Sequence, residues 1–119
     1  MKRVLWISRH QMTPFQVQDL VRGIGDDVEI STYDKTVQDV NELEEAIEAS
    51  DLVAAVLPME KMMELFHVVG DRPLIQAVSG RVETDQWIEL EDGRKERKYL
   101  FEHLYWQQIM KCEIVTKKL

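Results

Sequence analysis

Three consecutive polar residues, Ser8, Arg9 and His10, stand at the end of the first apolar run and carry side chains that can hold an anion. The run RVLWIS covers residues 3–8, and Arg9 and His10 come directly after Ser8. An arginine guanidinium can bind two phosphate oxygens at once, and a serine hydroxyl donates a hydrogen bond. His10 also has a structural interpretation, in which it only satisfies a loop carbonyl. Both interpretations stay open.

Further candidate anion ligands follow later apolar runs. They are Lys35, after residues 28–32, and Ser79, Gly80 and Arg81, at the end of residues 73–79. Gly80 would let a ligand approach the backbone closely, and Arg81 would add a second phosphate clamp. In an open parallel sheet, ligands bind outside the carboxyl ends of the strands where the strand order reverses. These residues predict a phosphate-bearing ligand there, although Lys35 also fits an ordinary turn and Arg81 could pair with a nearby acid.

The charge distribution favours a small anion over a nucleic acid. The net charge is −7, which argues against non-specific binding of nucleic acid, and we predict no duplex nucleic acid as partner. Residues 1–18 nevertheless contain Lys2, Arg3, Arg9 and His10 and no acid.

The elements that must position these residues alternate between strands and helices. Strands are predicted at 3–8, 28–32, 52–57 and 73–79. The run LVAAVL at 52–57 is apolar throughout, as expected for a central strand covered on both faces. This order predicts an α/β fold with a mostly parallel sheet and helices on both faces.

Capping residues predict where the helices begin. Thr13, Pro14 and Gln16 form a capping box with proline at the first helical position, and Gly23 and Gly25 end this helix. A second helix is predicted from a cap at Asn41 with Glu44 and the apolar stripe Val40, Leu43 and Ile47. A third helix follows Pro58 and ends at Gly70, with Met59, Met62, Met63 and Phe66 on its buried face.

The last third of the chain is less regular. Residues 87–99 predict a hairpin that turns at Asp92-Gly93. Residues 99–110 have apolar residues at helical spacing, and CEIVT at 112–116 predicts a final strand.

Several kinds of site and segment are not indicated. The segment GIGDD follows a helix rather than a strand, so it is not a dinucleotide fingerprint, and the three histidines have no metal-ligand spacing. We therefore predict no metal and no cofactor. The length predicts a single domain over 1–119, and the single cysteine favours a reducing, cytoplasmic setting. No apolar stretch reaches about 18 residues, so we predict no membrane partner.

The segment from Ser8 to Gln16 resembles the start of a known family. In small CARF-like proteins associated with type III CRISPR systems, a strand runs into S/R-H-x-L/M-T-P-x-Q and then a helix. The matching residues are Ser8, Arg9, His10, Met12, Thr13, Pro14 and Gln16. The resemblance implies a compact Rossmann-like fold, a homodimer, and a cyclic oligoadenylate ligand that lies over the dimer axis.

The same resemblance implies a role in CRISPR or phage defence, either as a sensor of the ring or as a metal-independent ring nuclease. In cleavage, a 2′-hydroxyl of the ligand would attack the neighbouring phosphate. His10 would be the general acid or base, and Arg9 and Arg81 would hold the phosphate. Ser8 and Thr13 would donate hydrogen bonds to the ligand.

Two other classes of function stay open. The chain could be a non-catalytic interaction domain from a prophage or defence island, in which acidic and aromatic surfaces meet a protein partner. It could also be a small nucleotide or phosphotransfer enzyme of flavodoxin-like shape. The latter has less support, because no predicted loop carries an acidic cluster for metal chemistry.

Overall fold

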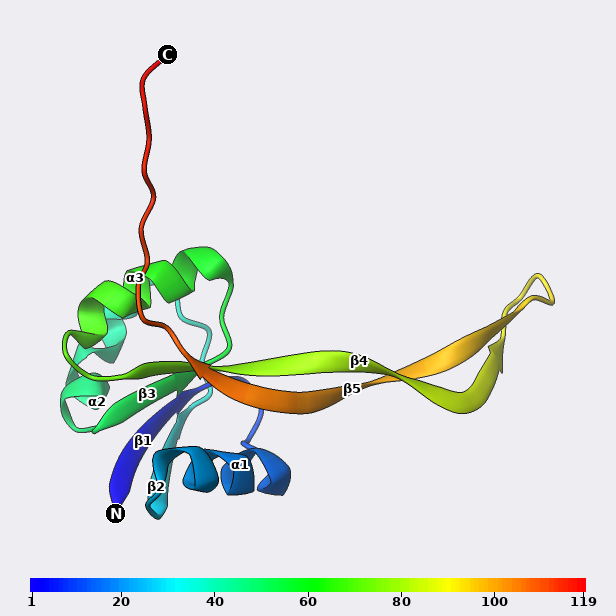
Figure 1. The fold of residues 1–119 in the computed structure, drawn as a ribbon, viewed down its shortest axis with the longest axis horizontal. Helices are drawn as coiled ribbons and strands as arrows, with labels where there is room; N and C mark the ends of the chain where they lie inside the picture. Colours follow the sequence, from blue (N-terminus) through cyan, green and yellow to red (C-terminus); the bar gives the residue numbers. More distant parts are fainter.

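The computed structural model describes residues 1–119, and its central element is a five-stranded sheet (Figure 1). The strands are β1 (Lys2–Ile7), β2 (Val28–Tyr33), β3 (Leu52–Ala55), β4 (Leu74–Glu89) and β5 (Lys95–Gln108). They lie in the order β2-β1-β3-β4-β5, with the first four parallel and β5 antiparallel to β4. The predicted α/β fold with a mostly parallel sheet is confirmed.

Three α-helices and a 3-10 turn connect the parallel strands. They are α1 (Pro14–Ile24), η1 (Val40–Leu43), α2 (Glu44–Glu48) and α3 (Met59–Val69). The capping box of α1 is confirmed: Thr13 Oγ1 accepts from the Gln16 N–H at 3.2 Å, and Gln16 Oε1 accepts from the Thr13 N–H at 2.9 Å. Gly25 ends the helix with a φ of 78°, a conformation that glycine adopts without strain.

Two details of the later helices differ from the prediction. Asn41 is not the cap of the second helix, because the Asp39 carboxylate accepts the Asn41 N–H at 2.9 Å and starts a 3-10 turn earlier. The stripe Val40, Leu43 and Ile47 is buried as predicted. Met59 is 67% exposed rather than buried, since the buried residues of α3 are Met62, Leu65 and Val69.

The core consists of two clusters that follow the alternation of side chains along β1 and β3. Leu5, Ile7, Val53 and Ala55 belong to the cluster that receives side chains from η1, α2 and α3. Val4, Trp6, Leu52 and Ala54 belong to the cluster that receives Leu20 from α1. Since neighbouring residues of a strand point to opposite faces, both faces of the two central strands are buried. This accounts for the apolar character of residues 52–55. The strand predicted at 52–57 is shorter than expected, because β3 ends at Ala55 and Val56 is 50% exposed.

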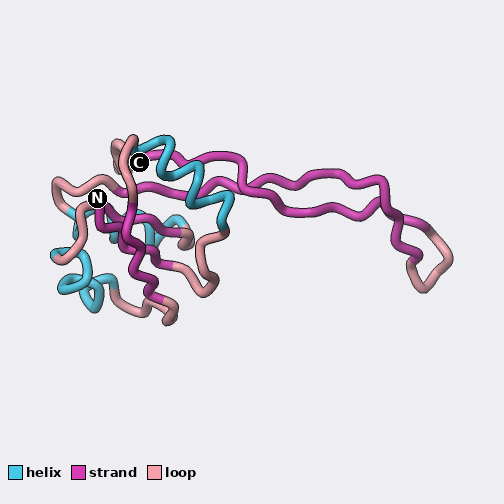
Figure 2. Tube along the Cα trace, turned by 90° about the horizontal axis from the view of Figure 1, so that it is seen from below, coloured by secondary structure: helices cyan, strands magenta, loops and turns pink.

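A long hairpin arm extends from this body (Figures 1 and 2). We define the arm as residues 79–104; β4 continues through it to Glu89, so the prediction that the fourth strand ends at Ser79 is wrong. The predicted turn at Asp92-Gly93 is confirmed, with the Gly93 N–H bonded to the Leu90 carbonyl at 2.9 Å. The arm helps to explain a radius of gyration of 17.7 Å, where a compact chain of this length would have about 13–14 Å.

The predicted helix over residues 99–110 is wrong, because this segment is the second half of β5. The turn brings it back antiparallel to β4, where Val82 pairs with Leu100 and Arg81 with Phe101. Tyrosine, phenylalanine and tryptophan favour strands, and pairing with β4 outweighs the helical spacing of the apolar residues.

The predicted final strand at 112–116 is also wrong. The chain leaves the sheet after the Ile109 N–H bonds to the Leu74 carbonyl at 2.8 Å, and residues 110–119 pair with no strand. A strand sequence without a neighbouring strand cannot satisfy its backbone groups in a sheet. None of the helices has both the length and the apolar character needed to cross a bilayer.

The α1 cap gives a first testable prediction. Replacing Thr13 with alanine removes the hydroxyl that accepts the Gln16 N–H, so the free energy of unfolding in urea should fall by about 1 kcal/mol. Thr116→Ala, in the unpaired C-terminal segment, is the matched control and should leave it unchanged. Equal effects of the two substitutions would contradict the role of the cap.

Candidate anion-binding site

The strand order reverses beside β1. The crossover from β1 through α1 leads to β2 on one side of β1, whereas the next crossover leads to β3 on its other side. The loops after β1 and β3 therefore diverge, and the gap between them is where open α/β sheets bind ligands. The reversal therefore adjoins the first strand.

A pocket of about 320 Å³ lies at this point, and we call it the switch-point pocket. It is lined by Ile7, Ser8, Arg9, Lys35, Thr36, Val37, Val56, Leu57, Pro58 and Lys61. These residues come from the carboxyl ends of three neighbouring parallel strands and from the first turn of α3. The fold thus joins Ser8 and Arg9 to Lys35, which the sequence separates by 25 residues or more.

Three cationic side chains surround the pocket. Arg9 and Lys35 are exposed, and the structure shows no ion pair for either of them. Lys61 is held more firmly: its Nζ donates to the Gln38 carbonyl at 2.8 Å and lies 3.5 Å from the Glu64 carboxylate. An anion entering the pocket would meet two uncompensated positive charges and one that is partly compensated.

Lys61 was missed by the sequence reasoning. It lies three residues after Pro58, on the first turn of the helix that follows the third strand. A signal was present, because a helix that begins at the carboxyl edge of a sheet holds its first turn near the ligand site.

The loop after β1 is fixed by the indole of Trp6. Trp6 is 2% exposed, and its Nε1 donates to the His10 carbonyl at 2.8 Å. The Ser8 hydroxyl accepts the His10 N–H at 3.2 Å, so it is engaged within the loop. The His10 ring is exposed and does not line the pocket. The predicted catalytic pair Arg9 and His10 is therefore divided, with Arg9 alone at the pocket wall.

Four other predicted ligand-binding residues lie outside this pocket. Thr13 caps α1, and the residues Ser79, Gly80 and Arg81 lie in the arm, paired with β5. A Cβ at Gly80 would come within 2.5 Å of the Leu104 side chain, so Leu104 occupies the space expected for a ligand. The Arg81 guanidinium lies 3.9 Å from the centre of the Tyr99 ring, and it does not pair with an acid. Placing these three residues in a loop at the strand end is therefore wrong.

A second polar cluster, which the sequence did not indicate, joins α1 to the base of the arm. His103 Nε2 lies 2.9 Å from Asp19 Oδ2, and these side chains are only 4% and 9% exposed. The hydrogen bond with His103 and that from Arg22 lower the pKa of Asp19 below its usual 3.8. Two aromatic rings, Phe15 and Trp106, pack against the His103 imidazole at 5.6 and 5.4 Å. The cluster is best explained as a structural joint.

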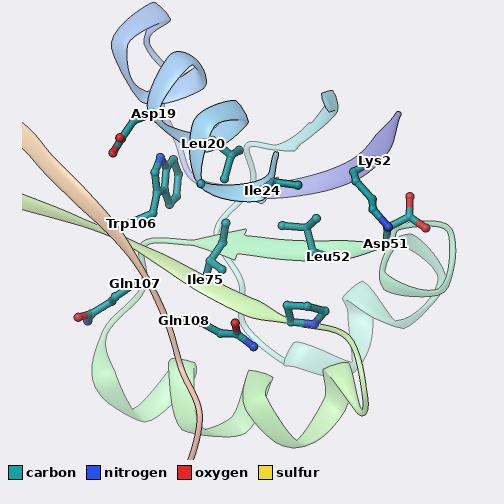
Figure 3. A pocket seen from close by; sticks show the side chains of 12 residues that line it. Lys2, Asp19, Leu20, Ile24, Asp51, Leu52, Ile75, Trp106, Gln107 and Gln108 are labelled. Carbon is teal, nitrogen blue, oxygen red and sulfur yellow. The ribbon is translucent and has the colours of Figure 1, made fainter. Parts of the chain in front are cut away.

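Other hollows lack this concentration of positive charge. One of about 400 Å³ lies between α1 and the amino-terminal ends of the strands, with Leu20, Ile75 and Trp106 in its wall and Lys2 and Asp51 at its rim (Figure 3). The backbone N–H and side chain of Arg3 lower the pKa of Asp51 there. Another, of about 540 Å³, has Asp39 and Glu64 beside Lys61. In both, acids offset the lysine, so the switch-point pocket is the better anion site.

Comparisons with protein-family models, with curated proteins and with solved structures found no match. No group of three or more His, Cys, Asp or Glu residues lies close enough together to hold a metal ion.

The lowered pKa of Asp19 predicts an acid sensitivity. Because its pKa is lower in the folded chain than the usual 3.8, the stability it contributes is complete above that pH and lost as the pH falls below it. Asp19→Asn should therefore be less stable at neutral pH and lose less stability between about pH 5 and about pH 3. Urea unfolding across that range measures this, with Asp85→Asn in the arm as control. A variant with the wild-type slope would refute the role of Asp19.

Proposed function

We propose that this chain is a Rossmann-like, CARF-like domain that binds a phosphodiester ligand of the cyclic oligoadenylate type in the switch-point pocket. The observation that carries the proposal is the convergence of Arg9, Lys35 and Lys61 on one pocket at the reversal of strand order. The resemblance of residues 8–16 to CARF-like proteins supplies the ligand class. The same resemblance supports a cytoplasmic setting in CRISPR or phage defence signalling.

Pocket size and chemistry support one nucleotide unit of a larger ligand. A volume of about 320 Å³ is at the lower end for small-molecule sites, which span about 300–1,000 Å³. The rest of a ring would lie over the carboxyl edge of the sheet. Arg9 would hold phosphate oxygens in a bidentate manner, Lys35 and Lys61 would act as point charges, and Thr36 would donate a hydrogen bond. Val56 and Leu57 offer apolar contact to a base or sugar.

Cleavage of the ligand stays a prediction beside binding. His10 follows Arg9 directly and has an exposed ring, so an imidazole is available next to the pocket wall. A general acid or base must come within hydrogen-bonding reach of the reacting oxygen. Binding by Arg9 and Lys35 does not require that movement, and we therefore propose binding as the primary activity.

A second candidate function, a protein-interaction domain, is favoured by the arm. Phe101 is 80% exposed, and Trp87, Ile88, Leu100 and Leu104 are about half exposed. Apolar surface of this extent on a projecting hairpin marks a surface that meets a partner. This function is compatible with ligand binding, because the arm residues and the pocket residues are different.

Ligand binding can be tested by thermal shift and calorimetry with cyclic oligoadenylates of several ring sizes. A ring present at 100 times its dissociation constant should stabilise the fold by about 2.7 kcal/mol. Arg9→Ala and Lys35→Ala should each weaken binding roughly tenfold to hundredfold, because each removes a charged hydrogen bond. Lys117→Ala, in the C-terminal segment, is the charge-matched control. Failure of every ring to bind, or equal weakening by the control, would overturn the proposal.

Cleavage is tested separately by incubating the full chain with the bound ring and separating the products by chromatography. A cleaving protein should yield linear fragments, and His10→Ala should slow their formation about 100-fold or more while leaving the dissociation constant unchanged. Intact ligand after prolonged incubation would leave a binding protein without nuclease activity. Unchanged cleavage by the variant would remove His10 from the reaction.

A further inference from the structure

The outer edge of β5 has no strand partner. β5 is the last strand of the sheet and pairs only with β4, so one side of its 14-residue backbone has no strand partner. Sheet proteins usually block such edges with proline, charged side chains, β-bulges, a covering element or a very short strand. The register of β4 against β5 shifts at Val78/Ser79 and at Glu83/Trp87, but the pairing is regular between these two points. Residues 95–108 contain no proline, and α1 contacts β5 only near its base, at His103 and Trp106.

The middle of this edge is complementary to itself. Residues 98–102 read Lys-Tyr-Leu-Phe-Glu. If two copies pair antiparallel with Leu100 opposite Leu100, Lys98 of each copy faces Glu102 of the other. In the same register, each Tyr99 faces a Phe101. Opposite charges and aromatic pairs directly across an antiparallel pair are stabilising, so the pairs that residues 98–102 make in this register are favourable.

The side chains of this segment are exposed, although one face of the Tyr99 ring lies against the Arg81 guanidinium. Phe101, Leu100 and Tyr99 are 80%, 48% and 40% exposed. The structure shows ion pairs elsewhere on the arm, between Arg97 and Glu83 and between Arg94 and Asp92, but none for Lys98 or Glu102. The two charges that flank Leu100 are thus without partners within the chain, and they have opposite sign.

The arm also needs support that its own chain does not supply. An isolated two-stranded hairpin is marginally stable in water, and stability increases when a third strand or a packing partner is added. Beyond its base, the arm has neither. A second arm paired along β5 would convert two separate ribbons into one four-stranded sheet.

We propose that a second copy of this chain docks on β5, antiparallel, about a two-fold axis at Leu100. The surface is isologous, since the same segment serves both copies, and the pairing closes after two chains. The two five-stranded sheets become continuous through their arms. This inference uses no residue of the switch-point pocket, and its two-fold axis lies in the arm. It therefore differs from the arrangement that the CARF-like resemblance implies, in which the ring lies over the dimer axis.

Charge reversal tests the register. Sedimentation equilibrium of the full chain should show a dimer, and Lys98→Glu or Glu102→Lys alone should weaken it by about tenfold or more, since each creates two like-charged pairs per dimer. The double variant Lys98→Glu/Glu102→Lys restores both pairs and should return to within about threefold of the wild type. Glu91→Lys, at the hairpin turn, is the control and should have little effect. A monomeric wild type, or a double variant no tighter than the singles, would overturn the proposal.

A cross-link tests the axis without changing charge. In a Cys112→Ser background, Leu100→Cys would bring two thiols together, because directly opposite residues have Cα atoms about 4.5–5.5 Å apart, within disulfide range. Added diamide should oxidise the two thiols to one intermolecular disulfide and give a covalent dimer on a non-reducing gel. Ile88→Cys in the same background, also on the arm, should give none. Cross-linking at Ile88→Cys and not at Leu100→Cys would show that another surface is used.

Discussion

The contact between Trp6 and Trp106 connects the parts of this molecule that matter for function. Their rings meet edge to face at 5.6 Å, one from the central strand β1 and the other from the base of β5. Each indole N–H also fixes a neighbouring backbone: Trp6 donates to the His10 carbonyl, and Trp106 donates to the Gln16 carbonyl at the start of α1. A buried indole N–H without an acceptor is costly, so these bonds define the positions of the loop that carries Arg9, of α1 and of the arm relative to one another.

One edge of the sheet consequently carries both features to which we assign a role. β4 is parallel to β3, which is parallel to β1. β4 continues past the carboxyl edge of the sheet into the arm. The switch-point pocket lies at that same edge. The two features differ in chemistry, since the pocket gathers positive charge and the middle of the arm exposes aromatic and aliphatic side chains. This contrast suits the two proposals, in which the pocket binds a small anion and the arm pairs with a strand of another copy.

Local signals predicted the parts of the fold that depend on neighbouring residues. The capping box at Thr13 and Gln16 and the turn at Asp92-Gly93 are confirmed, and of the buried strand predicted at 52–57 the part over 52–55 is confirmed. The errors in strand assignment arose where a distant strand decides the conformation. Residues 99–108 form a strand because β4 lies beside them, whereas residues 112–116 have strand-forming residues and no strand beside them. Pairing energy depends on a partner that local sequence does not identify.

For the candidate site, the sequence by itself determined that Ser8, Arg9 and Lys35 follow strands that run parallel, which directs them to one edge. Only the tertiary structure decided which side chains meet there. It brought Lys61 to the pocket through the first turn of α3, and it carried Arg81 away because β4 extends beyond the sheet. It also turned His10 from a candidate of uncertain role into a residue whose carbonyl, rather than its ring, is bound by the protein. The physical reason is that strand direction follows from local pattern, whereas strand length and side-chain contact depend on what packs alongside.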